Sequence, residues 1–181
     1  HRVAIIEDDY DHEFHYEGRP VLPLASVDHT GSVVYVGTLS KVLAPGLRLG
    51  YVVAPRAIAG KLLQAKQAAD LHTPIFNQRV VYEVIRTGLL EAHVPTIRAR
   101  YKLQRDAMDA ALHEHLAGLA QWQRPVGGMF FWLELPAGLD AMALLPRAVE
   151  AGMAFVPGEP FFAAAPMRNT LRLSFVTVAT D

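Results

Sequence analysis

The pattern of apolar and polar residues changes twice along the chain, from short apolar runs to helical spacing and back to short apolar runs. Residues 1–55 hold three apolar runs typical of strands, at Val3–Ile6, Val33–Val36 and Leu49–Ala54. Continuous β-branched runs of this length are typical of strands that are buried on both faces of a parallel sheet. The pattern therefore predicts a strand-rich unit at the start of the chain.

Helical spacing dominates the middle of the chain, over 57–71, 78–90 and 95–116. In the longest of these segments, apolar residues recur on one helical face. Pro95 near its start and Gly118 just past its end are the residue types expected at those two positions. The last third predicts an α+β unit, with strands over 128–135, 154–157 and 170–176 and a helix over 141–151.

Composition narrows the function classes. Apolar residues make up 51% and charged residues 19% of 181 residues, which excludes a disordered chain. The net charge of −1 argues against a nucleic-acid-binding surface. The absence of cysteine excludes disulfides, thiolate zinc sites and cysteine nucleophiles, and fits a reducing compartment such as the cytoplasm. No apolar run approaches the roughly 20 residues of a membrane helix. Because His1 opens the chain within a strand pattern, we expect a piece of a larger protein.

Two polar segments follow the first two predicted strands, and both carry reactive side chains. They are Glu7–Tyr10 and Thr38–Lys41. Ligands of open parallel sheets bind beyond the carboxyl ends of the strands, where neighbouring strand ends meet. Lys41 differs from the other three lysines of the chain, which all fall in helical patterns. A lysine at a buried strand end suggests an amine that attacks carbonyl groups to form a Schiff base.

Neighbouring side chains suit an anionic ligand with a pyridine ring. Thr38 and Ser40 offer hydroxyl groups, and Arg48 offers a planar guanidinium for a phosphate. An aspartate at the adjacent strand end can keep a pyridine nitrogen protonated. A plainer interpretation stands beside this one, in which the aspartate caps a turn and the loop lysine is solvated. The residues alone leave both interpretations open.

The segment Tyr35–Tyr51 resembles the pyridoxal-phosphate lysine segment of fold-type-I aminotransferases of class I and II. Ile6–Tyr10 resembles the strand of that family that ends in its pyridine-binding aspartate. The resemblance continues in chain order through 65–73, 125–132, 155–158 and 171–175.

The resemblance implies an α/β fold that corresponds to the C-terminal part of such a protein. Residues 1–95 would form the remainder of the large cofactor-binding domain, with mainly parallel strands. Residues 96–181 would hold a long connecting helix and a small α+β C-terminal domain, which is incomplete at its end.

The resemblance also implies pyridoxal 5'-phosphate as cofactor. Lys41 would form the Schiff base and move the proton between substrate and cofactor. Asp8 would pair with the pyridine nitrogen, and Tyr10 would hydrogen-bond the ring hydroxyl. The phosphate would be held by Thr38, Ser40 and Arg48.

Substrate recognition is implied at Arg172, which would bind the carboxylate of an amino acid or 2-oxo acid as a bidentate pair. The alternative is a strand arginine that pairs with a surface acid. The resemblance further implies a homodimer, and the spacing of the possible metal ligands gives no reason to expect a metal ion. The set of possible metal ligands over Asp9–His15 matches no H-E-x-x-H spacing and reads as a solvated loop.

Two functions compete within the family. Glu7–Tyr16 is similar to the aminotransferase-like domain of MocR-type regulators of the GntR group, which sense an effector and bind DNA through a separate upstream domain. Residues 65–73, 127–132 and 171–175 are similar to kynurenine and α-aminoadipate aminotransferases. Those enzymes usually carry Asp-Asp-Pro-Tyr, whereas Tyr10 here stands two positions after Asp8 without a proline.

Aromatic residues near the C-terminal end allow two uses. The stripe Phe130–Trp132 has the composition of a binding surface. In a strand, however, alternate residues face a core, so we expect packing to be its use. The same expectation applies to Phe161 and Phe162.

Overall fold

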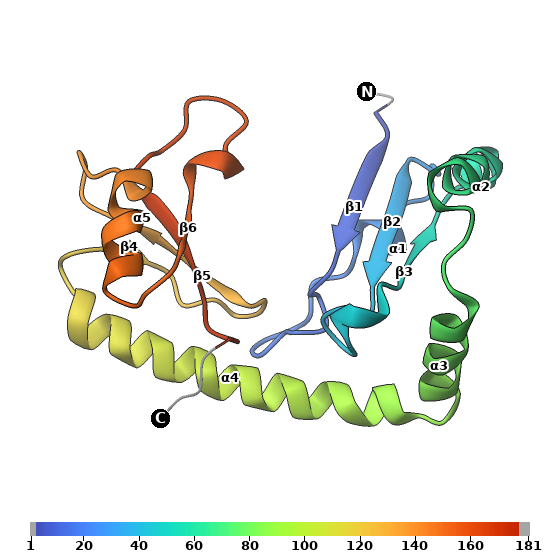
Figure 1. The fold of residues 1–181 in the computed structure, drawn as a ribbon, viewed down its shortest axis with the longest axis horizontal. Coiled ribbons are helices and arrows are strands. Elements are labelled where there is room, and N and C mark those ends of the chain that lie inside the picture. The colour runs from blue at the N-terminus through green and yellow to red at the C-terminus, as the bar shows by residue number, and fades with distance from the viewer. Residues whose placement is uncertain (1–2, 178–181) are drawn as a thin grey trace. The chain divides into compact units, whose positions relative to one another are not determined.

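The computed structural model describes residues 3–177, which divide into two compact units, the first ending at Arg98 and the second beginning at Ala99 (Figure 1). Each unit is described by itself. The predicted domain division between residues 95 and 96 stays a prediction, because compactness alone does not define the domains of a protein. No helix in the described range is long and apolar enough to cross a membrane.

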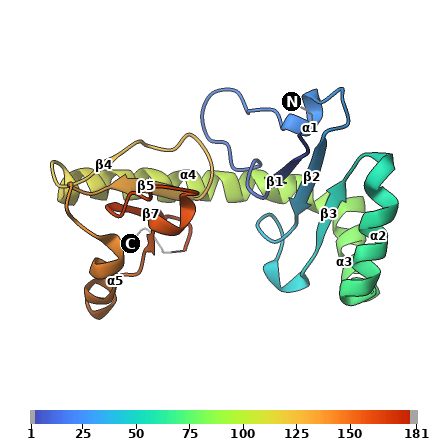
Figure 2. The same cartoon turned by 90° about the horizontal axis from the view of Figure 1, so that it is seen from above.

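The first unit is built on a three-stranded sheet of order β1-β2-β3 (Figure 2). The strands are β1 (Ile5–Asp9), β2 (Val33–Thr38) and β3 (Gly50–Val53). β1 and β2 pair in parallel, as predicted, whereas β2 and β3 pair antiparallel. Only the short loop 39–49 joins β2 to β3, and a parallel partner needs a crossover of about a dozen residues or more.

β1 extends further than predicted and contains the acidic segment that was expected to follow it. The pairing continues through Asp8 opposite Val36 and Asp9 opposite Gly37. The third acid, Glu7, has a structural role. Its carboxylate accepts hydrogen bonds of 2.7 and 2.9 Å from two backbone N–H groups at the start of α1 (Leu24–Val27).

The predicted burial of these strands on both faces is wrong for the described residues. Ile6 is 75% exposed, Val52 is 52% exposed and Val53 is 60% exposed. The core of this unit is small and lies elsewhere, at Phe14, Val42, Val81 and Val94. Apolar side chains of β1 and β3 are therefore exposed on both faces of this sheet.

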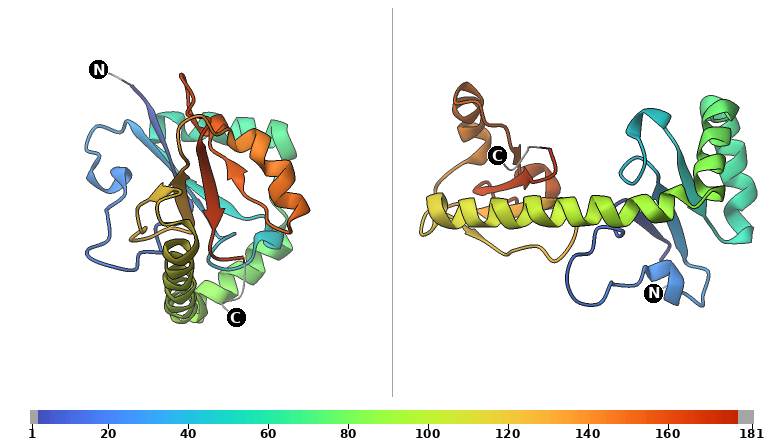
Figure 3. Two further views of the ribbon diagram at one scale, coloured as in Figure 1. Left: turned by 90° about the vertical axis from the view of Figure 1, so that its left-hand side faces the viewer. Right: turned by 90° about the horizontal axis from the view of Figure 1, so that it is seen from below.

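Three helices follow the sheet, namely α2 (Arg56–Asp70), α3 (Ile75–Arg86) and α4 (Leu89–Leu116). α4 is one continuous helix that begins before Pro95, so the predicted start at residue 95 is wrong (Figure 3). Pro95 is the seventh residue of α4, so the helix continues through a proline, which lacks the N–H for one hydrogen bond to the preceding turn.

The second unit is built on a four-stranded antiparallel sheet of order β4-β5-β7-β6. Its strands are β4 (Gln121–Trp122), β5 (Phe130–Glu134), β6 (Val156–Pro157) and β7 (Thr170–Ser174). α5 (Ala141–Glu150) begins at Asp140, whose carboxylate accepts from the N–H groups of Met142 and Ala143. Among the strands of the described range, only β1 and β2 pair in parallel, while the expected α/β fold is confirmed.

One face of this second sheet forms a compact core. Phe131 is fully buried, Leu133 is 1% exposed and Leu171 is 4% exposed. The rings of Phe131 and Phe175 meet edge to face, with centroids 5.7 Å apart. Because side chains alternate along a strand, the neighbours of these residues lie on the opposite face of the sheet.

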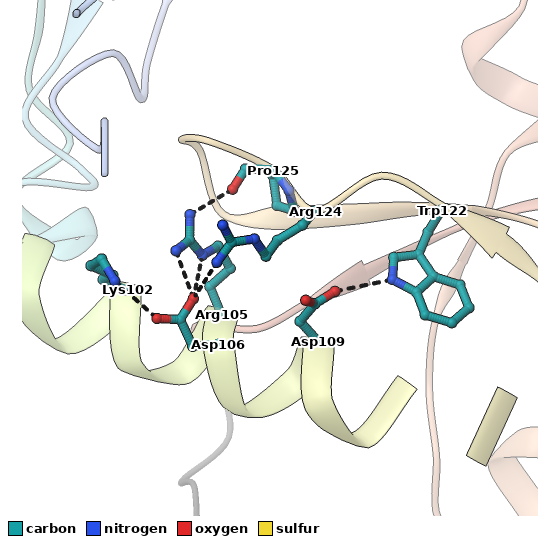
Figure 4. Close-up of polar contacts among 7 residues, drawn as sticks. All are labelled: Lys102, Arg105, Asp106, Asp109, Trp122, Arg124 and Pro125. Carbon is teal, nitrogen blue, oxygen red and sulfur yellow. Dashed lines mark hydrogen bonds and ion pairs between the residues drawn. The ribbon is translucent and has the colours of Figure 1, made fainter. Parts of the chain in front are cut away.

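A buried arginine fixes α4 to the loop before β5 (Figure 4). Arg105 is fully buried and donates from Nη1 to the Pro125 carbonyl over 2.8 Å. Its Nη2 donates to Oδ1 of Asp106 over 2.6 Å, and Arg124 donates to the same oxygen. Lys102 donates to the other carboxylate oxygen, Oδ2. Burial alone would raise the pKa of Asp106, but these hydrogen bonds and positive charges hold that pKa below its ordinary value.

Candidate functional site

The loop between β2 and β3, residues 39–49 and here called the lysine loop, is closed at its base. The N–H of Leu39 donates to the Leu49 carbonyl over 3.1 Å, and Oγ1 of Thr38 lies 3.4 Å from the same oxygen. Two hydrogen bonds to one carbonyl join the start of the loop to its end. The loop therefore has a defined backbone although it lies outside the sheet.

Lys41 lies on a single helical turn within this loop. The Ser40 N–H donates to the hydroxyl oxygen of Thr38 over 3.1 Å, which fixes the entry to the turn. The next residue, Val42, is buried and anchors the turn. Lys41 itself is exposed. The structure thus presents a solvent-accessible amine on a backbone that is held on both sides.

Arg48 lies at the far end of the lysine loop in a left-handed conformation, with φ of 51°. Its backbone N–H donates to the Pro45 carbonyl over 3.2 Å, and Nη1 lies 3.4 Å from the same oxygen. The side chain of Asn77 on α3 donates to the Leu47 carbonyl over 3.0 Å and ties the loop to that helix. Arg48 is exposed, so most of its N–H groups are accessible to an anion.

Asp8 and Thr38 lie at the carboxyl ends of neighbouring parallel strands. Asp8 stands opposite Val36, and Thr38 follows two positions later on β2. Because side chains alternate along a strand, all three residues lie on the same face of the sheet. The structure therefore brings together the two polar segments singled out in the sequence, with Asp8 exposed on this face.

Asp9 points to the opposite face and is the centre of a hydrogen-bonded group that the sequence did not reveal. Its side chain is 9% exposed and accepts from the hydroxyl of Tyr35 over 2.9 Å. Nδ1 of His12 lies 3.0 Å from the same carboxylate oxygen. Burial and the hydrogen bond to Asp9 raise the pKa of Tyr35, so the phenol stays a donor. The only sequence signal was the alternation of Asp8 and Asp9 along the strand.

A cavity of about 360 Å³ lies on the first unit beside this group. Tyr10 and Thr38 line it together with the Asp9 and Tyr35 pair. Asp11 also lines it, and burial together with the charge of Asp9 raises the pKa of Asp11. Over residues 3–177, no three acidic or histidine side chains converge in a way that would hold a metal ion.

Arg172 lies on β7 in the second unit and is held by aromatic rings. Its guanidinium carbon lies 4.0 Å from the ring centre of Phe130 and 4.9 Å from that of Phe161. Its Nε is buried without a hydrogen-bond partner. The alternative from sequence, a pair with a surface acid, is not formed within the described residues.

The aromatic stripe divides between two uses. The core packing predicted from sequence is confirmed for Phe131, whereas Phe130 and Trp132 lie on the face that carries Arg172. Phe161 belongs to the short helix η2 (Glu159–Phe161), and its ring meets the Trp132 ring edge to face at 5.6 Å.

Gly158 permits this arrangement. A β-carbon at this position would overlap the side chain of Thr170 and touch the indole of Trp132. The backbone can therefore approach the sheet closely enough to bring η2 over it only when residue 158 has no side chain. Sequence reasoning used this glycine as part of a family segment and gave it no role in positioning Phe161.

Comparison with known proteins places these features in context. The chain matches the family model for aminotransferase class I and II over residues 5–181. It is 44% identical to aromatic-amino-acid aminotransferase 1 of Thermococcus litoralis over 98% of the chain and 42% of that protein. It is 33% identical to the HTH-type transcriptional regulator YdfD of Bacillus subtilis over 99% of the chain and 37% of that protein.

Solved structures of aminotransferases are also similar to this chain. The chain superposes with a TM-score of 0.92 and 41% identity on an α-aminoadipate aminotransferase from Thermus thermophilus, complexed with N-(5'-phosphopyridoxyl)-L-leucine. This match covers 98% of the chain and 46% of that structure. The chain thus spans less than half the length of the proteins that it matches.

Proposed function

This chain belongs to the class I and II aminotransferases, and we propose that the protein that carries it moves amino groups between amino acids and 2-oxo acids with pyridoxal 5'-phosphate. The observation that carries the proposal is the lysine loop. It presents the exposed Lys41 on an anchored turn beyond the carboxyl end of β2, next to the strand that carries Asp8.

The residues present in the first unit fit this cofactor. Arg48 is exposed, and Thr38 and Ser40 stand at the entry to the lysine loop, so a cation and two hydroxyl groups are available for a phosphate. Asp8 is an exposed carboxylate on the same sheet face as Thr38, as a partner for a protonated pyridine nitrogen requires.

When bound, pyridoxal 5'-phosphate supplies an electron sink that stabilises negative charge at the α-carbon of an amino acid. The chain's own residues would hold and serve it. Nζ of Lys41 would bind the cofactor and accept and return the substrate proton. Asp8 would keep the ring nitrogen protonated, and Tyr10 would donate a hydrogen bond to the ring oxygen. Arg172 would bind the substrate carboxylate with its planar guanidinium.

A second candidate function is effector sensing within a transcription regulator. Two observations favour it. Tyr10 follows Asp9 directly without a proline, and a helix-turn-helix regulator is similar over nearly the whole chain. Higher identity to a named aminotransferase favours the enzyme. A homodimer and a cytoplasmic location stay predictions under either function.

The test locates the lysine that holds the cofactor. Pyridoxal 5'-phosphate is added to the protein that carries this chain, borohydride fixes the bound cofactor, and peptide masses identify the modified residue. We expect a single modification at Lys41, absent from Lys41→Ala and retained in Lys66→Ala, since Lys66 pairs with Asp70 on α2. Label spread over the other lysines, or an unmodified Lys41, would overturn the proposal.

An amino-transfer assay with an aromatic amino acid and a 2-oxo acid then separates the two functions. For the enzyme, Lys41→Ala lowers the rate at least about 10³-fold. For the sensor, the wild-type protein binds the cofactor at Lys41 and shows no turnover above the Lys41→Ala variant.

A further inference from the structure

The environment of Arg172 differs from that of Arg105, the fully buried arginine of the second unit. Arg105 is fully buried and is paired with a carboxylate and a carbonyl. Arg172 is half-buried and packs against the faces of two aromatic rings instead. Its charge is therefore not neutralised by any acid of the described chain.

The two rings come from different elements and reach Arg172 for different reasons. Phe130 stands on β5 one diagonal step from Arg172, because Trp132 is the residue directly opposite Arg172. Diagonal cross-strand neighbours are within reach of aromatic and long side chains. Phe161 is brought over the same face by η2, whose approach depends on Gly158. Together the rings restrict the guanidinium from two directions.

This arrangement orients the arginine and leaves its hydrogen-bonding capacity available. A ring face attracts a cation through its quadrupole without accepting the in-plane hydrogen bonds of the guanidinium. The buried Nε of Arg172 has no partner, and an unpaired buried donor is unfavourable until a ligand satisfies it. An acid in place of the rings would hold the arginine equally well but would occupy its N–H groups.

We propose that Phe130 and Phe161 are positioning residues that clamp the guanidinium of Arg172, so that its N–H groups meet a substrate carboxylate. This inference rests on the proposed function, in which Arg172 binds that carboxylate. Phe162 serves as the matched control. It is a neighbouring phenylalanine that packs against Trp132 at 6.2 Å and makes no such contact with Arg172.

The test separates orientation of the cation from simple apolar contact. Two probes of equal shape are used, 3-phenylpropanoate and 3-phenylpropanamide, of which only the first carries a carboxylate. Their aromatic tail suits a surface that includes Phe161, 52% exposed, and Trp132, 39% exposed. Calorimetry on the protein that carries this chain gives the affinity for each probe, and the ratio of acid to amide affinity is the readout.

We expect Phe130→Leu to lower this ratio about tenfold, within the range measured for cation–π contacts. Phe161→Leu lowers it less, because its ring is farther from the guanidinium. Phe130→Tyr keeps a ring face and retains the wild-type ratio, and Phe162→Leu leaves the ratio unchanged. In amino transfer, Phe130→Leu raises KM for the amino acid and the 2-oxo acid by a similar factor and leaves kcat nearly unchanged.

Two outcomes would overturn the inference, and they are distinguishable from failure of the proposed function. If Phe130→Leu weakens acid and amide equally, the rings supply only apolar surface. If Phe162→Leu lowers the ratio as much as Phe130→Leu, no specific clamp exists. The Arg172→Leu variant tests the proposed function itself. If this variant has the wild-type ratio of acid to amide affinity, Arg172 does not bind the carboxylate. Tryptophan fluorescence of each variant, which reports Trp132 beside Phe161, verifies that the unit is folded.

Discussion

The two units position their candidate functional side chains, Lys41 and Arg172, in different ways. In the second unit, one sheet face is a closed core around Phe131 and Leu133, and the other face carries Arg172. In the first unit, apolar residues such as Ile6 and Val53 are exposed, and Lys41 lies on a loop beyond the sheet. The first sheet thus lacks the packed face that supports the second.

The difference shows two ways in which a candidate functional side chain can be oriented. Lys41 is oriented by backbone hydrogen bonds that close its loop and by the single buried anchor Val42. Arg172 is oriented by side-chain packing on a sheet whose other face is a complete core. Substitutions in the core should therefore affect the second unit strongly, while exposed strand positions of the first unit should tolerate truncation.

The largest contrast is expected between Phe131→Ala and Val52→Ala. Phe131 is fully buried, so its truncation leaves a cavity and lowers the free energy of unfolding by about 3–5 kcal/mol. Val52 is 52% exposed, so its truncation changes stability by about 0.5 kcal/mol or less. Denaturant unfolding measures both, and the two tryptophans of the chain, Trp122 and Trp132, report the second unit.

This prediction is contradicted if Val52→Ala lowers the free energy of unfolding as much as Phe131→Ala does. Such a result would mean that further chain or a partner covers the first sheet in the protein that carries these residues. The continuous apolar runs that predict burial on both faces would then be correct for the assembled protein.

A second contrast concerns buried and exposed cations on α4. Arg105→Met leaves the Pro125 carbonyl without its donor and is expected to destabilise the second unit by about 3 kcal/mol. Lys102→Met removes the ion pair between Lys102 and the Asp106 carboxylate. Because the Lys102 side chain is 44% exposed, we expect the free energy of unfolding to fall by about 1 kcal/mol or less. Equal losses for the two variants would contradict the assignment of Arg105 as the anchor.

Substitution of a glycine by alanine is expected to lower stability at one position of the second unit and to raise it at one position of the first. Gly158→Ala overlaps Thr170 and is expected to cost about 1–3 kcal/mol. Gly60 lies in α2 with open space around it, so Gly60→Ala stabilises that helix by roughly 0.5–1 kcal/mol. Thermal unfolding by circular dichroism measures both signs. A stable Gly158→Ala variant would show that η2 does not depend on the close approach.

The sequence singles out individual residues more readily than it predicts the side chains that surround them. Lys41 stands out because it is the lysine outside a helical pattern, and strand alternation correctly places Phe131 in a core. The aromatic contact of Arg172 was not predictable. It depends on the cross-strand register of β5 and β7 and on the close approach at Gly158, and neither is encoded within a single segment.

The extent of β1 was missed for a similar reason. A run of three acids reads as the end of a strand, yet pairing with β2 holds Asp8 and Asp9 in the ladder. The three acids then differ in their surroundings: Glu7 accepts from the first N–H groups of α1, Asp9 accepts from Tyr35, and Asp8 is exposed. Their roles follow from side-chain alternation once the strand is known, which the composition alone does not reveal.

The smallest predicted effect is the pH dependence contributed by Asp106. The hydrogen bonds from Lys102 and Arg105 hold its pKa below the ordinary value of 3.8 in the folded state, despite a burial effect that opposes them. A depressed carboxyl pKa stabilises the fold at pH values above the unfolded pKa, and this contribution is lost as the pH falls toward the folded pKa.

The Asp106→Asn variant removes this pH-dependent contribution. Because the Asp106 side chain is 35% exposed, we expect wild type to exceed Asp106→Asn by about 1 kcal/mol or less at neutral pH. Unfolding free energies measured from pH 7 down to pH 3 should show this difference shrinking in acid. A difference that stays constant over the range would mean that Asp106 acts through its shape and hydrogen bonds and not through its charge.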